Sequence, residues 1–298
     1  MRVLVTGSRG MLGRNLTDYL SAMNYTVVPC SRVDVDLMNY EQVVSYFKES
    51  TPDVIIHLAG KVGSVKDVSE KPFEYYHSNM MLGLNVLKAA YELRIKKFIN
   101  MSSAIIYRSG ANTPFGESSL FNGELEKQKI GYSYAKEGIT LAVEMLNREH
   151  NTAYKNLVAS NIFGMFDNFD PVTGHMIPAI IRRIEMAKKT GDLVSIWGDG
   201  LANRQYIYAK DLCRIIEQII VDYDQLNITT LNVGGKEEYS VKHFYEKVGS
   251  MLNYEGRFVH DLSKPSGASS LCLNLNEFDT IYSDFQYTNI EEALNQTI

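Results

Sequence analysis

Short apolar runs alternate along the first half of the chain with longer segments whose apolar positions recur every three or four residues. The runs are apolar on both faces, as expected of strands in a parallel sheet covered on both sides. The spaced segments are typical of amphipathic helices. Together they predict an α/β fold with a doubly wound parallel sheet. The expected strands are Val3–Val5, Thr26–Val28, Val54–Leu58, Phe98–Met101 and Leu157–Ala159.

The helical period is clearest in two segments, one beginning near Leu12 and one over Ile139–Leu146. Beyond about Gly164 the pattern loosens into turn-rich sequence around a helix-like stretch at 177–188. We therefore expect a dinucleotide-binding domain over residues 1–164 and a smaller substrate-binding region over residues 165–298. The boundary between them is approximate, and an arrangement in which segments of the two regions alternate along the chain stays open.

Composition narrows the class of protein. The chain has 298 residues, of which 45% are hydrophobic and 22% charged, as in ordinary globular proteins. Its formal charge of −5 means that the chain lacks the excess of basic residues typical of proteins that bind nucleic acid. Three distant cysteines, Cys30, Cys213 and Cys272, predict neither a disulfide framework nor a metal site. With no signal-type or membrane-spanning apolar run, we expect a soluble cytoplasmic protein that is not held in a membrane.

A glycine-rich turn joins the first strand to the first helix. Gly7, Gly10 and Gly13 permit a tight turn and a close approach of the backbone to a pyrophosphate, and Met11 and Leu12 open the helix whose free amides attract phosphate. A tight strand-to-helix turn without a ligand is the simpler alternative. The position between strand and helix favours dinucleotide binding.

The end of the second strand bears on the choice of dinucleotide. An acidic residue there would bind a free ribose 2′-hydroxyl, but none occurs before Asp34. Arg32 and, from the glycine-rich loop, Arg9 supply cations suited to a 2′-phosphate. NADPH is therefore favoured over NADH, the alternative being two solvated surface arginines.

Tyr132 and Lys136 stand one helical turn apart, so their side chains share a helix face. With 19 tyrosines this spacing arises easily by chance, and a second copy occurs at Tyr206 and Lys210. The first copy is preferred because it opens a helix that follows a strand ending at Ser103, on the ligand side of a parallel sheet.

These residue types suit the reduction of a carbonyl group. A phenol has a pKa of about 10, and a neighbouring ammonium would lower it. Lys136 would supply that charge and hold the nicotinamide ribose, Ser103 would bind the substrate oxygen, and Tyr132 would give that oxygen a proton. The simpler alternatives are a surface tyrosine, a solvated lysine and a strand-end serine.

Taken in order, these motifs resemble the extended short-chain dehydrogenase/reductases of the NAD-dependent epimerase/dehydratase family. Within it the chain most resembles the GDP-L-fucose synthases, which are GDP-4-keto-6-deoxymannose epimerase-reductases. The resemblance implies a Rossmann fold and contact of the cofactor with Leu58 and Ala59. The stretches that carry it are Gly7–Gly13, Val54–Gly63, Asn79–Met81, Ser103, Tyr132–Lys136, Asn161–Gly164, Asp167–Phe169, Gly174–Pro178, Arg182–Arg183, Trp197–Gly200, Arg204 and Ser263–Gly267.

The resemblance also implies substrate-binding residues. Arg183 and Arg204 would clamp the substrate diphosphate, a task suited to planar guanidinium groups, although surface charges are the ordinary reading of such residues. Lys61 and Asn161 stand in motifs that, in the family, line the active-site cleft. Trp197, the only tryptophan, stands in a matching motif and is retained among these candidates, although core or hinge packing is the favoured role for it.

His175 matches the family's acid/base histidine, although a lone histidine is usually structural. His57, inside an apolar strand, is expected to be structural. Two departures from the family pattern stand out. Ile105 takes the place of the family's proton-transfer cysteine, and Ala268–Leu271 replaces a segment that tends to be basic.

The leading hypothesis is an NADPH-dependent reductase acting on the C4 ketone of a GDP-linked 4-keto-6-deoxy sugar without epimerising it. A bifunctional GDP-L-fucose synthase is the second, and a nonenzymatic dinucleotide-sensing or scaffold protein is the third. The resemblance implies a homodimer. Whether the sugar is a hexose or a heptose, and the C4 configuration of the product, stay open.

Overall fold

The computed structural model describes residues 1–107, 113–263 and 272–298. At its centre lies a six-stranded sheet in which every neighbouring pair is parallel, in the order β2-β1-β3-β4-β5-β9. The five strands expected from the sequence are confirmed, with ends that differ by a few residues. The strands are β1 (Arg2–Thr6), β2 (Thr26–Cys30), β3 (Val54–His57), β4 (Lys97–Ser103), β5 (Lys155–Ala159) and β9 (Thr230–Val233).

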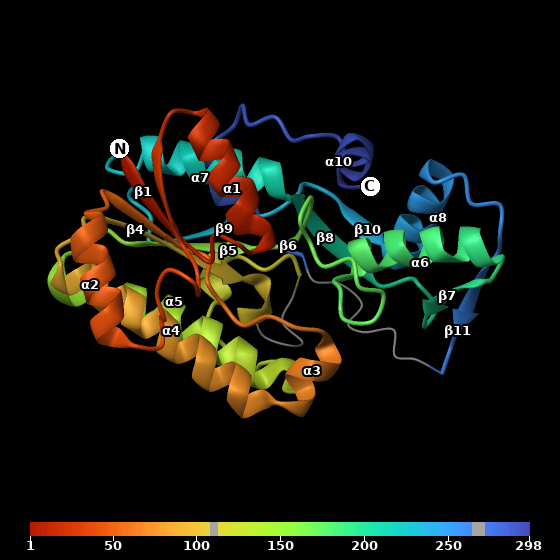
Figure 1. Cartoon of the computed structure of the whole chain (residues 1–298), viewed down its shortest axis with the longest axis horizontal. Helices are drawn as coiled ribbons and strands as arrows, with labels where there is room; N and C mark the ends of the chain where they lie inside the picture. The colour runs from red at the N-terminus through yellow and green to blue at the C-terminus, as the bar shows by residue number, and fades with distance from the viewer. Residues whose placement is uncertain (108–112, 264–271) are drawn as a thin grey trace.

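Helices cover both faces of this sheet (Figure 1). On one face α1 (Met11–Ala22) packs against α7 (Ala209–Val221), and their apolar sides join the larger core cluster. On the other face lie α2 (Tyr40–Ser50), α4 (Pro72–Glu92) and α5 (Ile130–His150). The fold is therefore the doubly wound α/β fold that the sequence predicts.

The second part of the chain has a core of its own, formed where α6 (Met176–Thr190) packs against α8 (Val241–Met251). The helix expected at 177–188 is α6. Two small sheets accompany these helices, in the orders β10-β8-β6 and β11-β7. Their strands are β6 (Asn161–Phe163), β7 (Val194–Trp197), β8 (Asn203–Tyr208), β10 (Glu238–Ser240) and β11 (Phe258–Asp261). The short helix α10 (Ile290–Thr297) joins this second core, whereas α9 (Asn276–Ile281) packs on β9 and α3 (Val65–Glu70) precedes α4.

Residues beyond 164 return to the central sheet. They supply its last strand, β9, and the covering helix α7. The division into residues 1–164 and 165–298 stays a prediction, with the two parts interleaved because β9 and α7 belong to the central sheet. None of the described helices has the length and apolar character needed to cross a bilayer.

Candidate active site

The predicted residues of the first half gather at the carboxyl end of the parallel strands. Strand β1 lies between β2 and β3, so the chain order reverses across β1. In open α/β sheets, ligands bind outside the carboxyl ends of strands at such a switch point. The loops after β1 and β3 touch there, since a Cβ atom built on Gly7 would lie 2.8 Å from the Ala59 nitrogen.

The glycine-rich loop has the shape needed to hold a pyrophosphate. Gly7 has a φ of +69°, and a Cβ atom on Gly13 would lie 2.1 Å from the Gly7 carbonyl oxygen. Gly10 caps α1 without any side-chain hydrogen bond, which leaves the first-turn amides of the helix open to a ligand. Loop and helix end therefore fit a dinucleotide.

A threonine fixes the neighbouring turn. The Thr6 hydroxyl oxygen accepts hydrogen bonds from the amides of Leu58 and Ala59, each at 3.1 Å. Its own proton is left for His57 Nδ1, 2.9 Å away. Burial lowers the pKa of His57 to about 3, so this ring stays neutral and structural.

Tyr132 and Lys136 both lie in α5, which contacts β4 and the short turn at Ala104–Ile106. Lys136 Nζ donates a hydrogen bond to the Met101 carbonyl at 2.9 Å, and burial lowers its pKa to about 8. Burial also raises the pKa of Tyr132 to about 12. The expectation that Lys136 lowers the pKa of Tyr132 is therefore wrong in this structure, where desolvation prevails.

Ser103 ends β4 beside this pair. Its oxygen accepts a long hydrogen bond of 3.5 Å from the amide of Ile105. Ile105, which replaces the expected cysteine, is half-buried against the larger core cluster. By contrast, Tyr206 and Lys210 belong to different elements, β8 and α7, so the second Tyr-x-x-x-Lys sequence is not one helix face.

Arg9 and Arg32 are exposed and form no hydrogen bond or ion pair with any described residue. Asp34, the nearest acid, accepts hydrogen bonds from the Ser31 amide at 2.8 Å and hydroxyl at 2.7 Å. Its carboxylate is thus engaged within its own turn. Asp34 therefore engages neither arginine among the described residues.

Lys61 is held from two sides. Its backbone amide donates to Asn79 Oδ1 at 2.9 Å, and Asn79 Nδ2 donates to the Lys61 carbonyl at 3.1 Å. Its side chain forms an ion pair with Glu74 and lies over the Tyr75 ring. A Cβ atom on Gly60 would lie 3.8 Å from Lys136 Nζ, so this turn borders the Tyr132–Lys136 pair.

His175 lies at the start of α6 with its side chain 48% exposed. Its Nδ1 bonds Asp167 Oδ1 at 3.0 Å, while the Asp167 side chain is only 2% exposed. This hydrogen bond raises the pKa of His175 above its ordinary value. The other carboxylate oxygen of Asp167 is buried without a hydrogen-bond partner among the described residues.

Arg183 and Trp197 lie together. Arg183 donates to the Pro171 carbonyl from Nε at 3.0 Å and from Nη2 at 2.6 Å, and to the Tyr245 hydroxyl at 3.1 Å. Its guanidinium carbon lies 5.4 Å from the centre of the Trp197 ring. Trp197 is 52% exposed, so the expected core packing is wrong: this residue covers an arginine at the surface.

Arg204 and Asn161 lie on two paired strands, β8 and β6. Asn161 Nδ2 donates to the Gln205 carbonyl at 3.2 Å, and Arg204 Nη1 donates to the Asn203 carbonyl at 2.6 Å. Burial lowers the pKa of Arg204. Ala268–Leu271, where the expected basic residues are lacking, lies outside the described residues.

Sequence reasoning assigned no role to Thr6, Asn79 or Asp167. Each is a polar residue that organises a candidate side chain or its loop. Asn79 and Asp167 stand in stretches that carry the family resemblance, which was the available signal.

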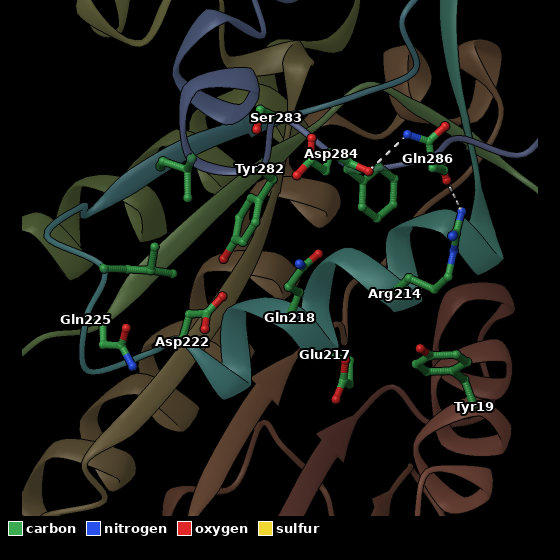
Figure 2. A pocket seen from close by; sticks show the side chains of 13 residues that line it. Tyr19, Arg214, Glu217, Gln218, Asp222, Gln225, Tyr282, Ser283, Asp284 and Gln286 are labelled. Carbon is green, nitrogen blue, oxygen red and sulfur yellow. Dashed lines mark hydrogen bonds between the residues drawn. The ribbon is translucent and has the colours of Figure 1, made fainter.

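A separate cavity of about 740 Å³, between α7 and residues 281–286, is lined by other residues such as Asp222 and Tyr282 (Figure 2).

Residues 3–234 match the NAD dependent epimerase/dehydratase family. The chain is 33% identical to GDP-L-colitose synthase of Yersinia pseudotuberculosis, an alignment that covers all of this chain and 96% of the relative. It is 34% identical to GDP-L-fucose synthase of Azorhizobium caulinodans, over 94% of this chain and 90% of the relative.

Solved structures share the fold. A GDP-L-fucose synthetase from Naegleria fowleri, determined with NADP bound, superimposes with a TM-score of 0.89 at 23% identity. The match covers 99% of this chain and 92% of that one. This agreement shows that both parts of the chain share the fold of that structure.

Proposed function

Because this chain belongs to the NAD-dependent epimerase/dehydratase family, we propose that it reduces the C4 ketone of a GDP-linked 4-keto-6-deoxy sugar with NADPH. The nicotinamide supplies the hydride. The protein then has to bind the ketone oxygen, give it a proton and hold the cofactor ribose. The sugar is a hexose or a heptose.

The observation that carries this proposal is the Tyr132–Lys136 pair in α5 beside the carboxyl end of β4. Tyr132 is protonated at neutral pH, as the acid of a reduction must be, although the burial that raises its pKa also weakens it as an acid. The Ser103 hydroxyl orients the ketone oxygen toward Tyr132. Lys136, fixed by the Met101 carbonyl, holds the ribose.

The cofactor is held by the glycine-rich loop, with the adenosine phosphate toward Arg9 and Arg32. The first-turn amides of α1 face the pyrophosphate, next to Gly7, Gly10, Met11, Leu12 and Gly13, while Leu58 and Ala59 border it from the neighbouring turn. Both arginines lack competing partners among the described residues, which favours NADPH over NADH.

The substrate's nucleotide is assigned from the relatives, which are named GDP-L-colitose and GDP-L-fucose synthases. Arg183 and Arg204 clamp its diphosphate, and Lys61 and Asn161 line the cleft. Arg183 must then exchange part of its contact with the Pro171 carbonyl for a phosphate, which its planar donor fork permits. Trp197 supports the Arg183 guanidinium from one face.

Reduction without epimerisation is proposed because Ile105 has no ionisable group. Inverting a carbon next to a ketone requires a base on one face and an acid on the other. His175, oriented by Asp167, provides only one of them. That dyad, together with the name of the Azorhizobium relative, favours a bifunctional GDP-L-fucose synthase as the second candidate.

A homodimer is proposed through α4 and α5. Phe73, Tyr76, Met81 and Leu84 of α4 are 38% to 75% exposed, as are Tyr134 and Met145 of α5 within the same range. Large exposed apolar side chains on packed neighbouring helices are typical of an interface. Sedimentation should give a dimer, and Leu84→Glu should give a monomer; a monomeric wild type would contradict the assignment.

The function is tested by NADPH oxidation with a panel of GDP-, UDP- and dTDP-linked 4-keto-6-deoxy sugars, with the products identified by NMR. We expect turnover with the GDP-linked members. Binding of NADPH without turnover of any 4-keto sugar would instead favour a dinucleotide-sensing protein. Turnover restricted to UDP- or dTDP-sugars would overturn the nucleotide assignment alone.

A further inference from the structure

The loop that carries Asp167 and His175 lies against the helix of the glycine-rich loop. Asn15 of α1 is buried, and its Nδ2 donates to the carbonyls of Met11 and Met165, each at 2.9 Å. The two carbonyls belong to segments about 150 residues apart in sequence. One amide group therefore joins the first turn of α1 to the loop after β6.

A second contact lies beside the first. The guanidinium carbon of Arg14 lies 4.1 Å from the centre of the Phe166 ring. Phe166 has a φ of +67°, a left-handed conformation that a bulky residue adopts only where its surroundings compensate. Two consecutive residues of α1 thus hold two consecutive residues of the loop.

The loop transmits this anchoring directly to the histidine. Asp167 follows Phe166, and its buried carboxylate accepts hydrogen bonds from His175 Nδ1 at 3.0 Å and from the Asn168 amide at 2.8 Å. A shift of Phe166 therefore moves the group that orients His175. Hydrogen bonds, a ring contact and peptide bonds therefore connect α1 to His175 without interruption.

We propose that Asn15 and Phe166 are positioning residues that couple dinucleotide binding at α1 to the ordering of the Asp167–His175 loop. This inference rests on the dinucleotide binding of the proposed function. A ligand on the first-turn amides of α1 restrains that turn, and Asn15 passes the restraint to Met165. The loop is then ordered before the sugar nucleotide arrives, so less conformational entropy is lost when it binds.

The test is hydrogen exchange of the amides in residues 165–175, with and without NADP⁺ at a concentration that saturates each variant. In the wild type NADP⁺ should slow exchange about five-fold, at the lower end of ordinary couplings. In Asn15→Ala the slowing should fall below about two-fold. NADP⁺ that touches the loop directly would protect it in both proteins and overturn the inference.

Asn85→Ala is the matched control. Asn85 Nδ2 also donates to two backbone carbonyls, those of Leu37 at 3.0 Å and Met38 at 3.1 Å, but on the opposite face of the sheet. The same atoms are lost, so thermal stability should fall in both variants. Only Asn15→Ala should lose the protection that depends on NADP⁺; an equal loss in Asn85→Ala would refute the coupling.

Phe166→Gly provides a second variant should Asn15→Ala fold poorly. Glycine accepts the left-handed backbone while removing the ring from Arg14. Its protection by NADP⁺ should lie between those of the wild type and Asn15→Ala, and full protection would contradict the inference. Failure of the wild type to bind NADP⁺ would refute the proposed function itself, whereas binding without protection of the loop refutes only the coupling.

Discussion

Acidification should destabilise the protein through His57. Its Nδ1 accepts a hydrogen bond from the Thr6 hydroxyl. The Thr6 oxygen in turn already accepts hydrogen bonds from the amides of Leu58 and Ala59. A second proton on the ring would face a hydroxyl that has no free lone pair for it. Burial, aided by the charge of Lys136, accordingly lowers the pKa of His57 from 6.5 to about 3.

The sign and size of the effect follow from this difference. The unfolded chain binds the proton below pH 6.5 and the folded chain only near pH 3, so the free energy of unfolding falls as pH drops through that window. Each pH unit is worth about 1.4 kcal/mol, which gives about 2 kcal/mol between pH 7 and pH 5. Above pH 6.5 the contribution is fully present.

Urea unfolding at constant ionic strength measures this loss. His57→Gln keeps an acceptor for Thr6 but does not titrate, and the remaining histidines titrate in both proteins. Between pH 7 and pH 5 the wild type should lose about 2 kcal/mol more than His57→Gln. Parallel losses in the two proteins would refute the assignment of His57 as a buried neutral histidine.

Three further predictions concern the reaction. Tyr132→Phe should bind NADPH normally but lose roughly 10²- to 10⁴-fold in turnover, whereas Tyr206→Phe should not; the reverse result would assign the acid to the wrong tyrosine. Arg32→Ala should lose most of the preference for NADPH, since a charge-assisted bond to the 2′-phosphate is worth about 1.5 to 3 kcal/mol; equal kcat/KM of the wild type with NADH and NADPH would contradict this. Because burial lowers the pKa of Lys136 to about 8, kcat/KM should fall as pH rises through that value and the ammonium is lost; persistence of this limb in Lys136→Met would show that another group titrates.

Five strands of the central sheet could be predicted because buried parallel strands appear in the sequence as short continuous apolar runs, whereas β9 in the second part of the chain was not predicted. Gly7, Gly10 and Gly13 could be recognised for a similar reason, since strand, turn and helix follow one another in sequence. In the second part of the chain, β6 pairs with β8 and β11 with β7 across about 40 to 60 residues. No local pattern records such pairings.

The candidate site, like the fold, could be predicted only where the signal is local in sequence. The spacing of Tyr132 and Lys136 gave their shared helix face, but the pKa of Tyr132 depends on how deeply α5 is buried, which spacing does not reveal. Core or hinge packing was the favoured role for Trp197, yet its side chain is 52% exposed and lies against the Arg183 guanidinium. The bond from Asn15 to the Met165 carbonyl joins a side chain to a distant backbone group and leaves no periodic trace.

The central claim is that this protein reduces its substrate at C4 without epimerising it. The most direct measurement is the reaction of GDP-4-keto-6-deoxymannose with NADPH in D₂O, with the product analysed by NMR. We predict a product reduced at C4 that retains hydrogen and the original configuration at C3 and C5, since Ile105 cannot transfer a proton. Deuterium at C3 and C5 with inversion at both carbons would contradict this account and establish the bifunctional reaction.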